Sequence, residues 1–271
     1  MPRELSLAYL TTEQSPPQAL QTAMRTGYSC AGIRLLPSSP GGQAYPLMND
    51  PRQLRETLAC QAGTGVRIAD LEMIRLDEAF NLESYLRFLE VGGLLQARAV
   101  LVAGDDHDPS RLTANFAALC EAALPFGLTA DLEFMPWTAV PDLASAWGIV
   151  EAANQPNSGV LIDAMHFARS NSTLQQLARI PFQHLHYAQL CDAPRAAPDT
   201  VEGLINAARC ERLLPGEGGL ALAELWSGLP AGLPVSVEVP NHAERARLGA
   251  DGWAQRARLA TLALLEDCIA A

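Results

Sequence analysis

The sequence contains no lysine, so all 19 of its basic residues are arginines. A Schiff-base aldolase or dehydratase needs a lysine amine as its nucleophile. Covalent imine chemistry on a side chain is therefore excluded for this protein.

Long apolar runs and paired cysteines are also missing. No run approaches the roughly 18 apolar residues of a membrane span, and residues 1–7 lack the apolar segment of a signal peptide. The six cysteines are scattered without CxxC spacing, as is usual for reduced thiols in a protein core. These absences predict a cytoplasmic protein with no membrane partner.

Basic charge is scarce relative to acidic charge. The 19 arginines stand against 30 Asp plus Glu, which gives a formal net charge of −11. A surface of this sign repels nucleic-acid phosphates, so nucleic acid is not an expected partner. Because 49% of the residues are hydrophobic, the chain can bury a large core.

Apolar, β-branched runs alternate with helical periodicity along the whole chain, which is typical of a parallel sheet. The predicted strands are Leu5–Leu10, Cys30–Leu36, Val66–Ile74, Ala99–Ala103, Leu128–Glu133, Gly159–Asp163, His184–Leu190 and Pro234–Val239. The predicted helices include Pro16–Thr26, Pro51–Gly63, Asn81–Gln96, Pro109–Pro125 and Pro141–Ala153. We expect one α/β domain over residues 1–271, a (β/α)8 TIM barrel.

An open doubly wound sheet is the main alternative fold. Such a sheet usually carries a glycine-rich phosphate turn after its first strand. Residues 10–17 contain no glycine, which favours the barrel.

Oxygen-bearing side chains end the last four predicted strands: Glu133, Asp163, Gln189 and Glu238. Neighbouring parallel strands lie about 4.8 Å apart, so these side chains should form an arc on one rim of the barrel. Three crowded carboxylates repel one another unless a cation neutralises them. All-oxygen ligation predicts a divalent metal, with Mn²⁺ or Mg²⁺ favoured and Co²⁺ or Zn²⁺ as alternatives.

At these residues the sequence resembles the xylose isomerase-like sugar phosphate isomerase and epimerase barrels. The similar segments are Leu161–His166, Gln189–Arg195, Pro215–Gly218 and Val235–Glu238, and the resemblance extends over essentially the whole chain. The superfamily also contains hydroxypyruvate isomerases, ketose 3-epimerases and 3-dehydroshikimate dehydratases. A Gln at the third ligand position looks most like the hydroxypyruvate isomerase branch.

The resemblance implies a role for each of these residues. Glu133, Asp163, Gln189 and Glu238 would bind the metal, and Glu133 and Glu238 would also be the acid/base pair that moves a carbon-bound proton. His166 would hydrogen-bond a substrate oxygen. Arg195 would contact a substrate hydroxyl or carboxylate, because a guanidinium can hold such a group in bidentate fashion.

Other residues keep two interpretations. His186 competes with Gln189 for the metal, but their opposite parity along the strand allows only one to face it; otherwise His184 and His186 would pack against the outer helices. Glu72 either contacts substrate or forms a buried pair with Arg34.

Two further features lie near the predicted site. Trp137 follows Glu133 closely enough to cover the pocket. The glycine-rich residues 215–219 could present backbone amides to an anion.

These features predict a metal-dependent isomerase or epimerase that acts on a small keto sugar or hydroxy-carbonyl compound through a metal-bound ene-diolate. The alternatives are a lyase of the 3-dehydroshikimate dehydratase type, which begins with the same proton abstraction, and a non-catalytic barrel that binds a metabolite. The only expected partner is the small carbonyl substrate; assembly into a homo-oligomer stays open.

Overall fold

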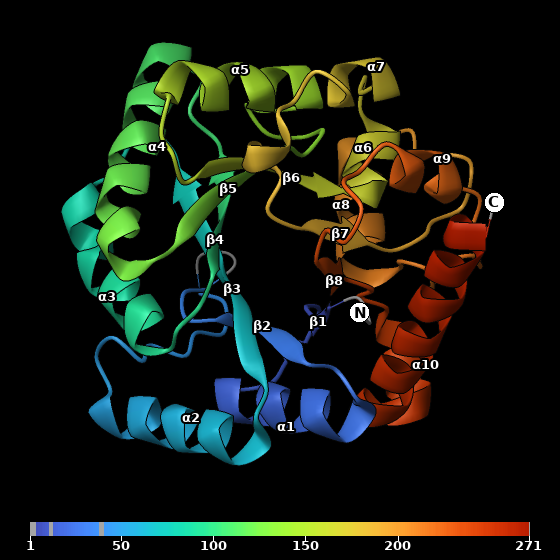
Figure 1. The fold of residues 1–271 in the computed structure, drawn as a ribbon, viewed down its shortest axis with the longest axis horizontal. Helices are drawn as coiled ribbons and strands as arrows, with labels where there is room; N and C mark the ends of the chain where they lie inside the picture. Colours follow the sequence, from blue (N-terminus) through green and yellow to red (C-terminus); the bar gives the residue numbers. More distant parts are fainter. Residues whose placement is uncertain (1–3, 11–12, 38–40, 271) are drawn as a thin grey trace.

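A computed structural model describes residues 4–10, 13–37 and 41–270 of the chain. Eight parallel strands follow one another in chain order and close into a barrel, since β8 pairs with β1 (Figure 1). The strands are β1 (Leu5–Leu7), β2 (Cys30–Arg34), β3 (Arg67–Leu76), β4 (Ala99–Gly104), β5 (Thr129–Glu133), β6 (Ser158–Asp163), β7 (Ala188–Leu190) and β8 (Val235–Val237). The predicted (β/α)8 barrel is confirmed.

Helices surround the strands on the outside of the barrel (Figure 1). They are α1 (Pro16–Thr26), α2 (Pro51–Thr64), α3 (Leu86–Leu94), α4 (Pro109–Ala123), α5 (Leu143–Ala153), α6 (Ala164–Arg169), α7 (Leu174–Leu177), α8 (Val201–Cys210), α9 (Leu222–Ser227) and α10 (His242–Ala270). Short 3₁₀ turns are η1 (Leu82–Tyr85), η2 (Leu124–Phe126) and η3 (Phe182–His184). None of the helices in the described ranges carries an apolar stretch long enough to cross a membrane.

Local sequence signals set the starts of several helices. The carboxylates of Asp50 and Asp108 accept the first backbone N–H groups of α2 and α4, and each is followed by a proline at the first helical position. The segment expected as one helix over residues 81–96 is instead divided between η1 and α3. The predicted strand over residues 184–190 is shorter than expected, because residues 182–184 form η3.

The interior of the barrel is unusually polar, whereas the main apolar core lies in the shell around it. Residues paired in register on parallel strands point to the same side of the sheet. The interior side of the sheet carries the buried Asp70, Glu72, Asp131, Glu133, Asp163 and Gln189. A small apolar group also lies within the barrel, formed by Ala99, Leu101, Leu161 and Tyr187.

Gly32 shows how closely these interior groups are packed. A Cβ atom at this position would collide with the Asp70 carboxylate. Glycine is therefore required on β2 to leave room for a buried acid on β3. The barrel is shaped around polar side chains that continue from its middle to its carboxyl-terminal rim.

Candidate active site

The four predicted ligand residues lie together at the carboxyl ends of β5 to β8. Glu133 and Asp163 are the last residues of β5 and β6, Gln189 lies in β7, and Glu238 follows β8 directly. Asp163 pairs in register with Gln189, so their side chains are neighbours on the interior side. Glu133, Asp163 and Gln189 are almost fully buried, and the Glu238 side chain is 18% exposed.

A cavity of about 330 Å³ opens at this rim. Its polar wall includes Glu72, Glu133, His166, Glu238, Arg34 and Arg212, and Trp137 lines it as well. Asp163 and Gln189 are not among the residues that line the cavity, and both are buried. The volume suits a small metabolite.

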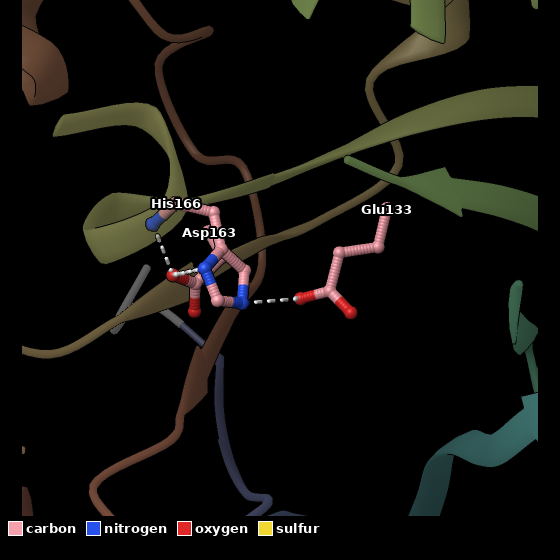
Figure 2. A group of neighbouring side chains, drawn as sticks. All are labelled: Glu133, Asp163 and His166. Carbon is pink, nitrogen blue, oxygen red and sulfur yellow. Dashed lines mark hydrogen bonds and ion pairs between the residues drawn. The ribbon is translucent and has the colours of Figure 1, made fainter. Parts of the chain in front are cut away.

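The His166 ring lies between the carboxylates of Glu133 and Asp163. Figure 2 shows its ring between the two carboxylates, with Nε2 3.7 Å from Glu133 Oε1 and Nδ1 4.0 Å from Asp163 Oδ1. Its position is fixed at the start of α6, where its backbone N–H donates to Asp163 Oδ1 at 2.9 Å. Possible ligand atoms of all three residues lie within 4.8 Å of one another, so they also form a potential metal-binding group.

Arg212 supplies the buried positive charge of the site. Its Nη1 lies 2.5 Å from Asp163 Oδ2 and 2.9 Å from Glu238 Oε2, and its Nε donates to the carbonyl of Ala208 at 2.8 Å. The guanidinium thus bridges the acids that follow β6 and β8. With only 3% of its surface exposed, it cannot exchange these partners for water.

The electrostatics of the site follow from burial and from this arginine. Burial, followed by repulsion from Glu238 and Asp163, raises the pKa of Glu133 well above its ordinary value. Burial also raises the pKa of Glu238 to about 8, although Arg212 opposes the shift. For Asp163, burial acts in the same direction, but Arg212 and His166 outweigh it and hold the pKa below its ordinary value.

The imidazole ring of His166 carries no charge in this site. Burial lowers its pKa to about 4, so the imidazole is uncharged near pH 7. The Trp137 ring meets it edge-on, with centroids 5.1 Å apart. A neutral ring can offer one donor and one acceptor to a substrate oxygen.

The residues present fit a divalent cation. Both polar atoms of the Gln189 side chain are buried and have no hydrogen-bond partner among the described residues, an arrangement that costs free energy unless a ligand uses them. A cation held by Glu133, Asp163, Gln189 and Glu238 would engage the Gln189 oxygen and would relieve the repulsion that, after burial, contributes to the raised pKa of Glu133. Arg212 already neutralises part of the negative charge, so the protein and the cation would share this task.

The structure does not bring Arg195 to the cavity. Its side chain is exposed in the loop after β7, whereas the cavity is lined by Arg212 from the segment after α8. Arg212, which is not among the residues predicted for the site, is the arginine that lines the cavity beside Glu238, and a substrate contact for Arg195 stays a prediction. The available signal in the sequence is that Arg212 lies three residues before Pro215, where the glycine-rich residues 215–219 begin.

The remaining candidates are resolved as follows. Glu72 forms the buried ion pair with Arg34, and because it also lines the cavity, its contact with a substrate stays a prediction. His184 packs against Trp147 of α5, as expected for a ring that faces the outer helices. His186 does not face the outer helices as expected. It precedes β7, and its ring turns into the barrel, where Nδ1 lies 2.6 Å from Asp131 Oδ1.

Two curated relatives are 3-dehydroshikimate dehydratases. The one from Pseudomonas aeruginosa is 31% identical over 143 residues, which are 51% of this chain and 22% of that protein. The one from Pseudomonas putida is 26% identical over 255 residues, or 89% of this chain and 38% of that protein. An inosose isomerase from Halalkalibacterium halodurans is 28% identical over 111 residues, which cover 40% of this chain and 37% of that protein. The chain thus spans less than two fifths of the length of each of these enzymes.

Solved structures share the fold over nearly the whole chain. A xylose isomerase-like TIM barrel/4-hydroxyphenylpyruvate dioxygenase fusion protein has a TM-score of 0.80 and 23% identity, and the match covers 98% of this chain and 43% of that one. The IolI protein, solved with a bound zinc atom, has a TM-score of 0.79 and 18% identity, and the match covers 97% and 98%. The sequence model of the family described as "xylose isomerase-like TIM barrel" matches residues 27–260. The chain belongs to the xylose isomerase-like TIM barrel family.

Proposed function

We propose that this protein is a metal-dependent enzyme that removes a proton from the carbon next to the carbonyl group of a small hydroxylated substrate. The observation that carries the proposal is the buried group formed by Glu133, His166 and Asp163, of which Glu133 and His166 line the cavity, with Glu238 held by Arg212 on the same rim. Buried carboxyl groups with raised pKa values are suited to general acid–base catalysis near neutral pH.

Each residue has a distinct task in this proposal. Glu133 and Glu238 both line the cavity, so a bound substrate can meet one carboxyl group as base and the other as acid. Neutral His166 hydrogen-bonds a substrate oxygen. Arg212 fixes Glu238 and adds positive charge next to the oxygen on which negative charge develops.

Glu133, Asp163, Gln189 and Glu238 would hold the divalent cation, with Mn²⁺ or Mg²⁺ favoured by the all-oxygen donor set. When bound, such a cation polarises the substrate carbonyl and stabilises the negative charge that forms as the proton leaves. Gln189 is neutral, so it adds a ligand without adding to the repulsion between the three carboxylates.

Loss of water is the outcome that we favour after proton abstraction. A relative that matches 89% of the residues of this chain is a 3-dehydroshikimate dehydratase. In such a reaction the carbon-bound proton goes to the base, a carbon–carbon double bond forms, and the β-hydroxyl group leaves as water after it receives a proton from the acid. The two carboxyl groups at the cavity supply that base and that acid.

Isomerisation is the second candidate. It is favoured by the similarity to inosose isomerase, although that similarity covers only 40% of the chain. Here the abstracted proton would return to a neighbouring position, and no hydroxyl group would leave. The same residues would serve, because both reactions begin with the same step.

A direct experiment separates the two reactions. The protein is incubated with Mn²⁺ and 3-dehydroshikimate, and a new conjugated absorbance is followed; a parallel panel of keto sugars, inososes and hydroxypyruvate is scored for incorporation of solvent deuterium. A conjugated product from 3-dehydroshikimate supports the dehydratase. Deuterium incorporation into another substrate without a conjugated product supports the isomerase, and no reaction with either set contradicts the proposal.

A further inference from the structure

The loop that follows Arg212 is held by one buried carboxylate. Asp192, two residues after the end of β7, is 2% exposed, and its two oxygens accept four backbone N–H groups. Oδ1 accepts from Ala193 at 2.8 Å and from Leu220 at 3.1 Å, and Oδ2 accepts from Gly216 at 3.0 Å and from Gly218 at 2.9 Å. We call these four N–H groups the amide nest.

The loop is built to receive this carboxylate. Gly216 has φ +86°, a left-handed conformation that favours glycine, and a Cβ atom on residue 218 would collide with the Asp192 side chain. The backbones of Asp192 and Leu213 also exchange two hydrogen bonds, of 2.9 and 2.8 Å. Successive N–H groups of this kind normally bind an external anion, and here the protein supplies its own.

This arrangement bears directly on Arg212, because Leu213 is its neighbour in the chain. The backbone N–H of Arg212 donates to the carbonyl of Pro240 at 3.0 Å, and its carbonyl accepts from the Asn241 side chain at 2.9 Å. One side of the Arg212 backbone is thus fixed to the segment after β8, and the other side is fixed through Leu213 to Asp192. The guanidinium reaches Asp163 and Glu238 from this double anchor.

We infer that Asp192 is a positioning residue whose carboxylate acts as the resident anion of the amide nest and thereby sets the place of the Arg212 guanidinium. Because Asp192 fills the nest, its four N–H groups are not available to a phosphate group of a substrate. The effect on turnover rests on the proposed function, but the placement of Arg212 does not.

The test uses Asp192→Ala, which empties the nest while the glycines stay in place. We expect amide exchange of Gly216 and Gly218, followed by NMR, to accelerate at least about tenfold, and the Arg212 Nε–H resonance to shift. Added formate, a free carboxylate, should reverse both changes. The matched control is Asp108→Ala, which removes a carboxylate that also accepts two backbone N–H groups but caps α4 away from Arg212; it should leave the Arg212 resonance unchanged.

Activity gives a second measurement. Asp192→Ala should lower kcat/KM about tenfold or more, and formate should restore part of it. The double variant Asp192→Ala/Arg212→Lys should have a kcat/KM no more than about twofold below that of Arg212→Lys alone. The effects of substitutions at residues that act as a unit do not add.

An unchanged Arg212 resonance in Asp192→Ala, or no reversal by formate, would overturn the inference. If Asp192→Ala does not fold, Asp192→Asn keeps one acceptor oxygen, and the same shift of the Arg212 resonance is required of it. The NMR measurements need no substrate, so a wrong substrate assignment would abolish only the activity measurements and leave the others decisive.

Discussion

Replacing Arg212 by methionine removes the buried positive charge but keeps a long side chain in its place. The change separates Nη1 from Asp163 Oδ2 and Glu238 Oε2, which it contacts at 2.5 and 2.9 Å. The side chains of Arg212 and Asp163 are 4% and 0% exposed, so water cannot replace the lost partner. The variant leaves two carboxylates without their nearest cation, next to a third at Glu133.

The expected loss in the free energy of unfolding is large. Breaking a buried ion pair by removal of one partner costs about 3–5 kcal/mol, because the remaining charge stays desolvated. Arg25→Met provides the matched control, since Arg25 contacts Asp251 at 2.5 Å but both side chains are almost half exposed. An exposed pair contributes only about 0.2–1 kcal/mol.

Urea-induced unfolding at pH 7 in the presence of a chelator measures both variants without contribution from bound metal. We expect the free energy of unfolding to fall by about 3–5 kcal/mol for Arg212→Met and by less than about 1 kcal/mol for Arg25→Met. Equal and small losses in the two variants would refute the view that Arg212 is the internal cation of the site.

Three further predictions concern pH, metal and substrate. Burial raises the pKa of Asp70 to about 8, so between about pH 4 and pH 8 the folded state holds a proton that the unfolded state has released. The free energy of unfolding should therefore fall as pH rises through this window, by up to about 1.4 kcal/mol per pH unit. Asp70→Asn should weaken this pH dependence in urea titrations at pH 5 and pH 7.5, and an unaltered slope would show that Asp70 is ionised when buried. Metal analysis of protein purified without chelator should find about one divalent ion per chain, reduced by Asp163→Asn and by Glu238→Gln, whereas full occupancy in both variants would remove these residues from the ligand set. Arg212→Lys should lower kcat/KM about tenfold or more, because lysine cannot reproduce the two parallel hydrogen bonds of a guanidinium. The kcat/KM of Arg195→Lys should stay within about twofold of the wild type. A larger loss of kcat/KM in Arg195→Lys than in Arg212→Lys would assign the substrate contact to Arg195.

The barrel and its acidic rim could be predicted because they depend on local patterns. Strand spacing gave the order of the sheet, and the rule that parallel strands end at one rim brought Glu133, Asp163, Gln189 and Glu238 together. Register with Asp163 places Gln189 on the interior side, as the alternation rule predicts, but the rule fails for His186, which precedes β7 and also turns inward. None of these inferences needs knowledge of side chains outside the strands.

Arg212 and Asp192 could not be placed in this way. Arg212 follows α8 and reaches the site because its neighbours Leu213 and Glu211 pair with Asp192 after β7 and with Asn241 after β8, a path set by the loop and not by periodicity. The glycine-rich loop was expected to present its amides to an external anion, but a carboxylate 20 or more residues earlier in the chain fills it. Contacts between distant loops depend on backbone geometry that composition does not encode.

In the proposed reaction, Glu133 moves the substrate proton. Glu133→Gln keeps an oxygen for the metal and removes the base, so metal content at saturating manganese should survive better than activity. General acid–base catalysis typically contributes about 10²–10⁴-fold. The decisive measurement is therefore the exchange of the substrate's carbon-bound proton with solvent, at saturating manganese, in the wild type and in Glu133→Gln. We expect the exchange rate to be at least about 100-fold lower in Glu133→Gln than in the wild type. Exchange at the wild-type rate would show that Glu133 is not the base and is at most a metal ligand.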